Sequence, residues 1–198
     1  MKAKPKAAAA VPALPPRERI VNAARELFYR NGIHAVGVDA IAAAAQTNKM
    51  TLYRHFESKD QLIAECLRRL AAEFDVAWGE IAHAHADDPR RQLMAWLRHI
   101  AEFKLSGTER GCAFVNAAVE LPDANHPARH VIEEAKTLYR DRIIALCRKA
   151  GLSQPEMLAD ELFLLCEGAR VSIQSVGPEG PAARLADMLQ ELVAAHAR

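Results

Sequence analysis

The chain has 198 residues, an apolar content of 51% and a formal net charge of +1 at pH 7. This size and composition allow one or two modest hydrophobic cores and exclude a wholly disordered chain. No apolar run reaches the roughly 18 residues of a membrane span, and the amino terminus lacks the apolar run of a signal peptide. The four cysteines are too far apart in the sequence for a zinc or disulfide framework. We therefore expect a cytoplasmic protein.

Positive charge is concentrated in the amino-terminal third. Residues 1–60 contain ten Lys or Arg and five Asp or Glu, whereas residues 61–198 contain sixteen and twenty. Phosphate binding needs such a local basic surplus. Residues 1–16, rich in Ala, Pro and Lys, are expected to form a flexible arm.

The apolar pattern is helical, because β-branched runs and alternating segments are scarce. A first helix is expected from about Arg17 to Asn31, where Asn31-Gly32 is a stop signal. In the next segment Val38, Ile41, Ala42 and Ala45 recur at the i, i+3, i+4 and i+7 positions of a one-sided helix. The pattern predicts a second, short helix.

The second helix is expected to end at a tight turn. The pattern breaks at Gln46 and Thr47, after which Asn48 can cap a third helix that ends near His55. Two short helices joined in this way are typical of a helix-turn-helix, in which the later helix enters a major groove of DNA. The lysines of residues 1–16 are then either part of an ordinary disordered terminus or additional contacts with the DNA backbone.

A capping box begins the fourth helix. Ser58 and Gln61 have the spacing at which side chains satisfy the free amides of a first helical turn. Those amides and the helix dipole form a phosphate site, and Lys59 adds a full charge beside it.

The segment that contains these helices resembles a known family. Ile41-Ala42 and the run Thr51-Leu-Tyr-Arg-His-Phe-Glu-Ser-Lys-Asp-Gln-Leu62 are similar to the DNA-binding domain of the TetR/AcrR class of bacterial transcriptional regulators. The resemblance covers Arg17 to about Leu70. Two positions depart from it, since Gly37 stands where the family usually has Thr, and Gln46 where it usually has Gly. Gly37 can still cap a helix, and Gln46 is expected to adopt a left-handed conformation at some energetic cost.

The resemblance implies an all-α fold with two domains. An amino-terminal three-helix helix-turn-helix DNA-binding domain is expected over residues 17–60, and a carboxy-terminal helical ligand-binding and dimerisation domain over residues 61–198. The expected helices of the second domain run from Ser58 to the His83–His85 region, from Pro89 to before Ser106, from Cys112 to Leu121, from Pro127 to Ala150, from a capping box at Ser153–Glu156, and through Leu185–Leu192.

The recognition helix carries most of the expected DNA contacts. Lys49 and Arg54 can bind guanine acceptors, and Met50 can contact a thymine methyl group. The residues expected at the DNA are Gly37, Asn48, Lys49, Met50, Thr51, Tyr53, Arg54, His55 and Lys59.

The family motif places phosphate contacts at Thr51, Tyr53, His55 and Lys59. Tyr53 has an alternative role in packing between helices. His55 alternatively caps or supports the fourth helix.

The middle helices contain a mixture of aromatic, thiol, amide and charged groups that suits a mostly apolar effector. The run from Arg110 to Glu120 resembles a segment that borders the effector site in one branch of the family. The candidate ligand-binding residues are Trp78, Trp96, Phe103, Cys112, Phe114, Asn116, Glu120, Tyr139, Cys166, Glu167 and Arg170. Core packing explains Phe114 and Cys112 equally well, and Cys112 beside Arg110 is also a candidate redox sensor.

The last two helices are expected to form a homodimer interface, since each has more apolar surface than one small core requires. A two-fold dimer reads two half-sites. The expected interface residues are Leu158, Leu162, Leu165, Ala169, Leu185, Met188, Leu189 and Leu192. The alternative is that both stripes pack only inside one subunit.

These features predict a ligand-responsive transcriptional regulator, a repressor that binds a pseudo-palindromic operator as a homodimer and is released by a small-molecule effector. The sequence has no nucleophile and base, metal cluster or phosphate loop at the spacing that catalysis requires, so neither an enzyme nor a cofactor is expected. His83 and His85 point apart on a helix and predict no metal site. An activator with the same fold and a structural helical dimer without DNA affinity remain alternatives.

Overall fold

The computed structural model describes residues 14–105 and 110–197, apart from the side chains of residues 103–105. Most of the expected amino-terminal arm, residues 1–13, lies outside this range. The described segments are helical, as the sequence predicts, and contain no strand. The helices are α1 (Pro16–Asn31), α2 (Val38–Ala44), α3 (Lys49–His55), α4 (Lys59–Ala84), α5 (Pro89–Leu105), α6 (Ala113–Glu120), α7 (Pro127–Lys149), α8 (Pro155–Val176), a 3₁₀ turn (Pro181–Arg184) and α9 (Leu185–Ala195).

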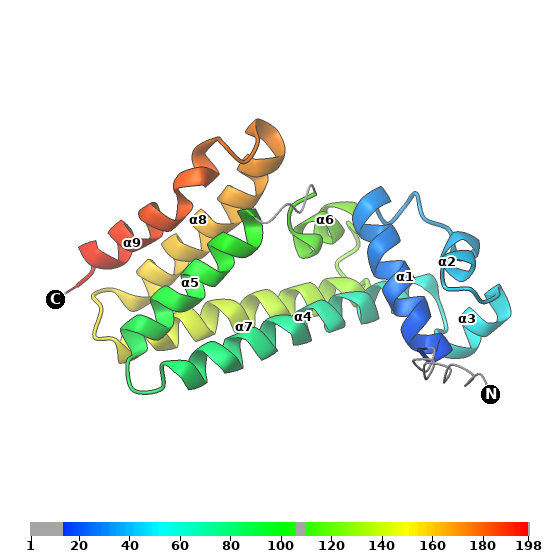
Figure 1. The fold of residues 1–198 in the computed structure, drawn as a ribbon, viewed down its shortest axis with the longest axis horizontal. Helices are drawn as coiled ribbons and strands as arrows, with labels where there is room; N and C mark the ends of the chain where they lie inside the picture. Colours follow the sequence, from blue (N-terminus) through cyan, green and yellow to red (C-terminus); the bar gives the residue numbers. More distant parts are fainter. Residues whose placement is uncertain (1–13, 106–109, 198) are drawn as a thin grey trace, which may run out of the picture.

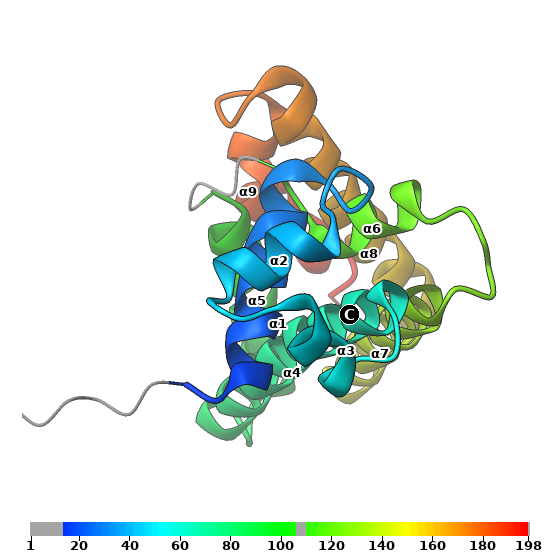
Figure 2. The same ribbon diagram turned by 90° about the vertical axis from the view of Figure 1, so that its right-hand side faces the viewer.

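The molecule is elongated, with α1, α2 and α3 grouped at one end (Figure 1). The long helices α4 and α7 run side by side away from this group, and α5, α8 and α9 lie at the other end. Figure 2 looks onto the end that carries α2 and α3. Within the described ranges, every helix is too short or too polar to cross a membrane.

Local sequence signals determine the helix-turn-helix as predicted. The Asn48 side chain accepts a hydrogen bond from the Thr51 amide at 2.9 Å, and Ser58 Oγ accepts one from the Gln61 amide at 3.1 Å. Both side chains therefore satisfy amides that a helix start leaves unpaired. Gln46 has φ 52°, the left-handed conformation expected where the family usually has Gly. Gly32 has φ 87° and ends α1.

One hydrophobic cluster holds the three amino-terminal helices together. Ile20, Ile41 and Leu52 are fully buried in it, together with Leu62 from the first turn of α4. Full burial of such a side chain contributes about 1.5–3 kcal/mol to stability. The same cluster includes residues of α6 and α7, such as Phe114. Apolar packing is thus continuous across the boundary that was predicted between the two domains after residue 60.

Ion pairs join α1 to α4 along the face between them. Glu65 accepts hydrogen bonds from Arg17 at 2.9 Å and from Arg69 at 3.2 Å. Arg69 also makes a two-pronged contact with Glu18, at 2.7 and 3.0 Å. Burial acts to raise the pKa of Glu65, but the hydrogen bonds and charges of the two arginines outweigh it and hold this pKa below the ordinary 4.5.

One local prediction was wrong. Ser153 does not cap α8, and its hydroxyl and backbone amide both donate to the carbonyl oxygen of His196 after α9. Gln154 occupies the cap position in a left-handed conformation, without a capping side chain. A contact with the carboxy-terminal end of the chain has replaced the local one.

The Glu65 pairs predict a pH-dependent stability. A carboxylate whose pKa is lower in the folded state stabilises the fold above its unfolded-state pKa, and this contribution disappears as the pH falls through the folded-state pKa. Glu65→Gln should lower the free energy of unfolding near neutral pH by about 1–3 kcal/mol. Urea denaturation should show the stability gap between the two proteins narrowing as the pH falls below 4.5, the ordinary pKa of a glutamate. Glu57→Gln, at an exposed position, is the control. A difference in unfolding free energy that does not change with pH would contradict this account.

Candidate functional site

Helix α3 has one buried edge and one exposed face. Leu52 is 0% exposed and Phe56, which follows the helix, is buried, so both hold α3 against the three-helix core. Met50 is 80% exposed, and the side chains of Tyr53 and Arg54 also face outward. The helix therefore presents a row of apolar, aromatic and cationic groups that lies free on the surface of the subunit.

The remaining predicted DNA residues surround this face. Asn48, Lys49 and His55 are exposed, and Thr51 is half-buried. The Lys49 ammonium lies 3.4 Å from Asp39 of α2, in an exposed pair of the kind that solvent screens strongly. Gly37 is exposed at the start of α2, with open space where a Cβ would be.

Lys59 has an intramolecular partner that the sequence did not predict. Its Nζ donates a hydrogen bond of 2.6 Å to the carbonyl oxygen of Ile33 and lies 5.8 Å from the centre of the Phe28 ring. Burial lowers the pKa of Lys59, while Asp60 and Glu120 act to raise it. Lys59 thus ties the start of α4 to the turn after α1, and its contact with phosphate stays a prediction.

Glu120, at the end of α6, contacts the same turn from the other domain. Its Oε2 accepts hydrogen bonds from the amides of Ile33 at 2.6 Å and of His34 at 3.1 Å. The His34 ring nitrogen Nε2 lies 2.7 Å from the backbone oxygen of Glu120. The turn that leads into the helix-turn-helix is therefore anchored to both α4 and α6.

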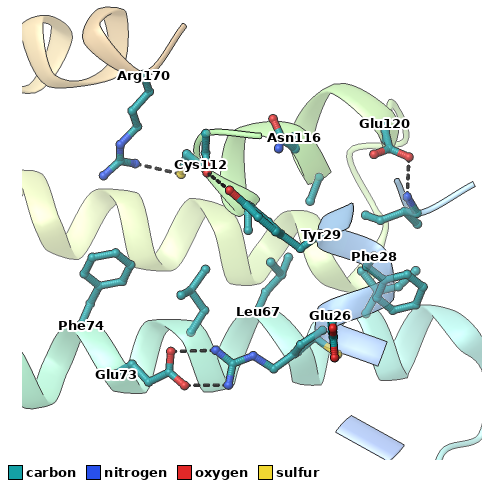
Figure 3. A pocket seen from close by; sticks show the side chains of 18 of the residues that line it. Glu26, Phe28, Tyr29, Leu67, Glu73, Phe74, Cys112, Asn116, Glu120 and Arg170 are labelled. Carbon is teal, nitrogen blue, oxygen red and sulfur yellow. Dashed lines mark hydrogen bonds and ion pairs between the residues drawn. The ribbon is translucent and has the colours of Figure 1, made fainter. Parts of the chain in front are cut away.

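A cavity of about 450 Å³ lies between α1, α4, α6 and the inner face of α8. Figure 3 shows Glu73 and Phe74 of α4 on one side, Tyr29 of α1 pointing toward Cys112 on the opposite side, and Arg170 reaching down from α8 toward the same cysteine. The wall is mostly apolar. Its lining residues include Phe28, Ile33, Ile63, Leu67, Leu70, Ala113, Ala117 and Ile173.

Hydrogen bonds fix the upper edge of this cavity. The Tyr29 hydroxyl donates to the carbonyl oxygen of Gly111 at 3.2 Å and accepts from the Arg110 amide at 3.3 Å. Asn116 Nδ2 donates to the Arg110 carbonyl oxygen at 2.6 Å. Contacts between α1 and the start of α6 thus hold the cavity in shape.

The structure separates the predicted ligand residues into two groups. Cys112, Asn116, Glu120 and Arg170 line the cavity. The side chain of Phe103 lies outside the described residues. The others do not line it, and they are Trp78, Trp96, Phe114, Tyr139, Cys166 and Glu167.

Aromatic packing explains several of the residues outside the cavity. The rings of Trp78 and Trp96 meet edge to face with centres 5.0 Å apart, and Tyr139 lies 5.9 Å from Trp96. Trp96 and Cys166 belong to the core of the second domain, and Phe114 to the first cluster. The sequence pattern indicated that these side chains are buried, and they are buried in the hydrophobic cores rather than at the cavity.

Sequence reasoning missed the lining residues of α1 and α4. Phe28, Tyr29 and Phe74 line the cavity, as do the paired Arg25 and Glu73, whose bidentate contacts measure 2.6 and 2.7 Å. Their helices were assigned to DNA binding or to the link between domains. No local signal marks them, because the cavity forms only where α1 and α4 meet α6.

The predicted interface residues need a correction. Leu158, Leu162, Leu185 and Leu189 are buried inside the subunit, where they pack against α5 and α7, so they cannot also contact a partner. Ala169 is buried as well, and Leu165 and Leu192 are partly buried in the same core. Of the predicted set, only Met188 counts among the exposed large apolar residues.

Comparisons with known proteins identify this architecture. The family described as bacterial regulatory proteins, tetR family, matches residues 20–66, which span α1 to the first part of α4. The chain is 49% identical over 51 residues to the HTH-type transcriptional regulator UidR of Escherichia coli K12, a match that covers 26% of each chain. It is 26% identical over 162 residues to the HTH-type transcriptional repressor DhaR of Mycobacterium sp. GP1, covering 78% of this chain and 80% of that protein.

A solved structure extends the similarity to almost the whole chain. A TetR-family transcriptional regulator from Streptomyces coelicolor matches with a TM-score of 0.86 and 28% identity, covering 92% of this chain and 96% of that one. The chain belongs to the TetR family. This TetR-family protein is a DNA-binding transcriptional regulator and not an enzyme.

The anchoring of the turn after α1 predicts the effect of removing the Glu120 carboxylate. Glu120→Ala leaves the Ile33 and His34 amides without their acceptor, and an unsatisfied polar group costs about 1–3 kcal/mol. We expect a lower melting temperature and faster hydrogen exchange at these two amides. Glu133→Ala, on an exposed face of α7, is the matched control. Unchanged exchange at Ile33 and His34 would contradict the anchoring role.

Proposed function

We propose that this TetR-family regulator is a homodimeric repressor whose two α3 helices bind successive major grooves of a pseudo-palindromic operator. The observation that carries the proposal is the orientation of α3, which buries Leu52 and exposes Met50, Tyr53 and Arg54. One helix of this length covers few base pairs, so a two-fold dimer is needed to read a longer site. The similarity to DhaR, a transcriptional repressor, over 78% of this chain supports the direction of regulation.

A revised dimer surface supports the two-fold arrangement. Met157, Leu164 and Val171 lie on one exposed face of α8, opposite the buried leucines, and Met188 of α9 is also exposed. Gly168 lies on this face with open space where a Cβ would be. A helical Gly costs about 1 kcal/mol relative to Ala, and nothing inside the subunit requires it. Close approach of a second α8 helix accounts for both the apolar stripe and the glycine.

The cavity is positioned to couple an effector to DNA binding. Its wall includes α1 and α4, which belong to the same hydrophobic cluster as α3. An effector that binds one arrangement of α1, α4 and α6 more tightly than another shifts the equilibrium between them, and operator affinity shifts with it. We propose that the favoured arrangement moves the two α3 helices away from the spacing of the half-sites, roughly 34–36 Å or a multiple of it.

The DNA-reading role predicts a loss of base preference when Arg54 is removed. Arg54→Ala should weaken operator binding by about 1–3 kcal/mol and reduce the preference for operator over random duplex. Gel-shift titration against the DNA upstream of its own coding region measures both. Arg98→Ala, an exposed arginine on α5, is the control. An equal loss on operator and random DNA would contradict a base contact by Arg54.

The revised interface predicts dissociation when charge is introduced on α8. Leu164→Glu and Val171→Glu place a carboxylate at positions 69% and 55% exposed in the subunit, where it would be buried in the dimer. Sedimentation equilibrium should show monomers, and operator affinity should fall with the dimer. Val76→Glu on α4, 62% exposed and away from α8, should leave the dimer intact. A stable dimer in both α8 variants would contradict this interface.

A further inference from the structure

Next to the cavity lies a group of charged side chains in which the positive charges outnumber the negative ones. The Lys136 ammonium donates to both carboxylate oxygens of Glu167 at 2.8 Å, and Arg170 Nη1 lies 3.2 Å from the same carboxylate. One carboxylate is therefore shared by two cations. Burial acts to lower the pKa of Arg170, and the groups that raise it besides Glu167 are Cys112, Tyr139 and Cys166, none of which is a carboxylate.

Arg170 is the cation of this group that lines the cavity. It is only 8% exposed, and its Nη1 lies 2.8 Å from Cys112 Sγ (Figure 3). A thiol sulfur is a weak acceptor, whereas a guanidinium forms its strongest hydrogen bonds in pairs with a carboxylate. Burying a charge without a full partner is costly. The position therefore favours an anion that enters from the cavity.

The other charged lining residues already have partners among the described residues. Arg25 and Glu73 form a bidentate pair, and Glu120 accepts from two backbone amides. Glu26 lies 3.2 Å from Arg30. Apart from these groups and the uncharged polar side chains of Asn22, Tyr29 and Asn116, the wall is mostly apolar, from Phe28 on α1 to Phe74 on α4. A ligand for this space therefore needs one anionic group at the α8 end and an uncharged apolar body.

We propose that the cavity binds a small monoanionic molecule, whose carboxylate pairs with Arg170 and whose hydrocarbon part lies against α1 and α4. The ligand carboxylate takes the place of Cys112 Sγ at the guanidinium and balances the second cation. This inference rests on the proposed function and names the chemical class of its effector. It also means that the hydrocarbon part touches α1, so that the effector contacts the DNA-binding domain directly.

A series of probes that differ in charge tests the proposal on the full-length protein. The probes are 2-naphthoate, 2-naphthalenemethanol and 2-naphthylmethylammonium, which share one apolar ring system and carry a negative, zero and positive charge. Isothermal titration calorimetry measures each dissociation constant. We expect 2-naphthoate to bind at least about tenfold more tightly than the other two, because only it gains charge-assisted hydrogen bonds. Equal affinities, tightest binding of the ammonium, or no 2-naphthoate binding at about 1 mM would overturn the proposal.

Substitution of Arg170 assigns the preference to this side chain. Arg170→Gln should remove most of the advantage of 2-naphthoate over the alcohol while leaving alcohol binding nearly unchanged. Arg142→Gln is the matched control, because Arg142 pairs with Asp75 and packs over Trp78 away from the cavity. An unchanged preference in Arg170→Gln would overturn the proposal. If that variant does not fold, the charge series on the natural sequence still decides.

A gel shift separates this inference from the proposed function. Failure of all three probes to bind, with operator binding intact, would contradict the anionic ligand and leave the repressor proposal standing. Binding of 2-naphthoate at Arg170 without any change in operator affinity would support the anion site and contradict release by an effector in this cavity. Weaker operator binding in the presence of 2-naphthoate, but not in Arg170→Gln, supports both.

Discussion

The structure depends on one continuous helix that belongs to two cores. The first turns of α4 bury Leu62 and Ile63 beneath the helix-turn-helix, and its later turns place Trp78 against the core of the second domain. An α-helix of 26 residues is about 39 Å long and transmits displacement along its axis, because its backbone hydrogen bonds resist bending. Lys59 and Glu120 add a second connection, since both bind the turn after α1. The cavity therefore has walls that belong to both parts of the chain, from α1 and α4 to α6 and α8.

Much of this fold could be predicted from the sequence, because its signals are local. Asn48 and Ser58 each satisfy an amide three residues ahead, and Gln46 adopts the left-handed conformation that a tight turn requires. The periodic spacing of apolar residues is also a local signal, and it predicted the helices. The cap expected from Ser153 is absent, and the amide and hydroxyl of this residue instead bind a distant group, the carbonyl oxygen of His196. A local capping signal therefore does not determine the structure where a residue distant in the sequence offers a hydrogen-bond partner.

The site was less predictable, because an apolar stripe indicates burial without indicating what covers it. Leu158 and Leu162 pack inside the subunit, while the exposed apolar face of α8 carries Leu164 and Val171 instead. The cavity could not be predicted from any one helix, because its edges join residues far apart in the sequence, as Tyr29 and Gly111 do. Four of the predicted ligand residues line the cavity. Cys112, Asn116 and Glu120 lie at the start of α6 or within it, and Arg170 of α8 contacts Cys112. The aromatic candidates instead pack together in the cores.

The most direct test of the account is hydrogen exchange, measured by mass spectrometry, on the full chain with and without the DNA from upstream of its own coding region. Bound DNA should slow exchange in α3 and in the first turn of α4, because these backbone segments would face the duplex, and should leave exchange in α5 unchanged. If the protein is saturated with DNA and exchange in α3 is unchanged, α3 is not the reading helix and the account is wrong.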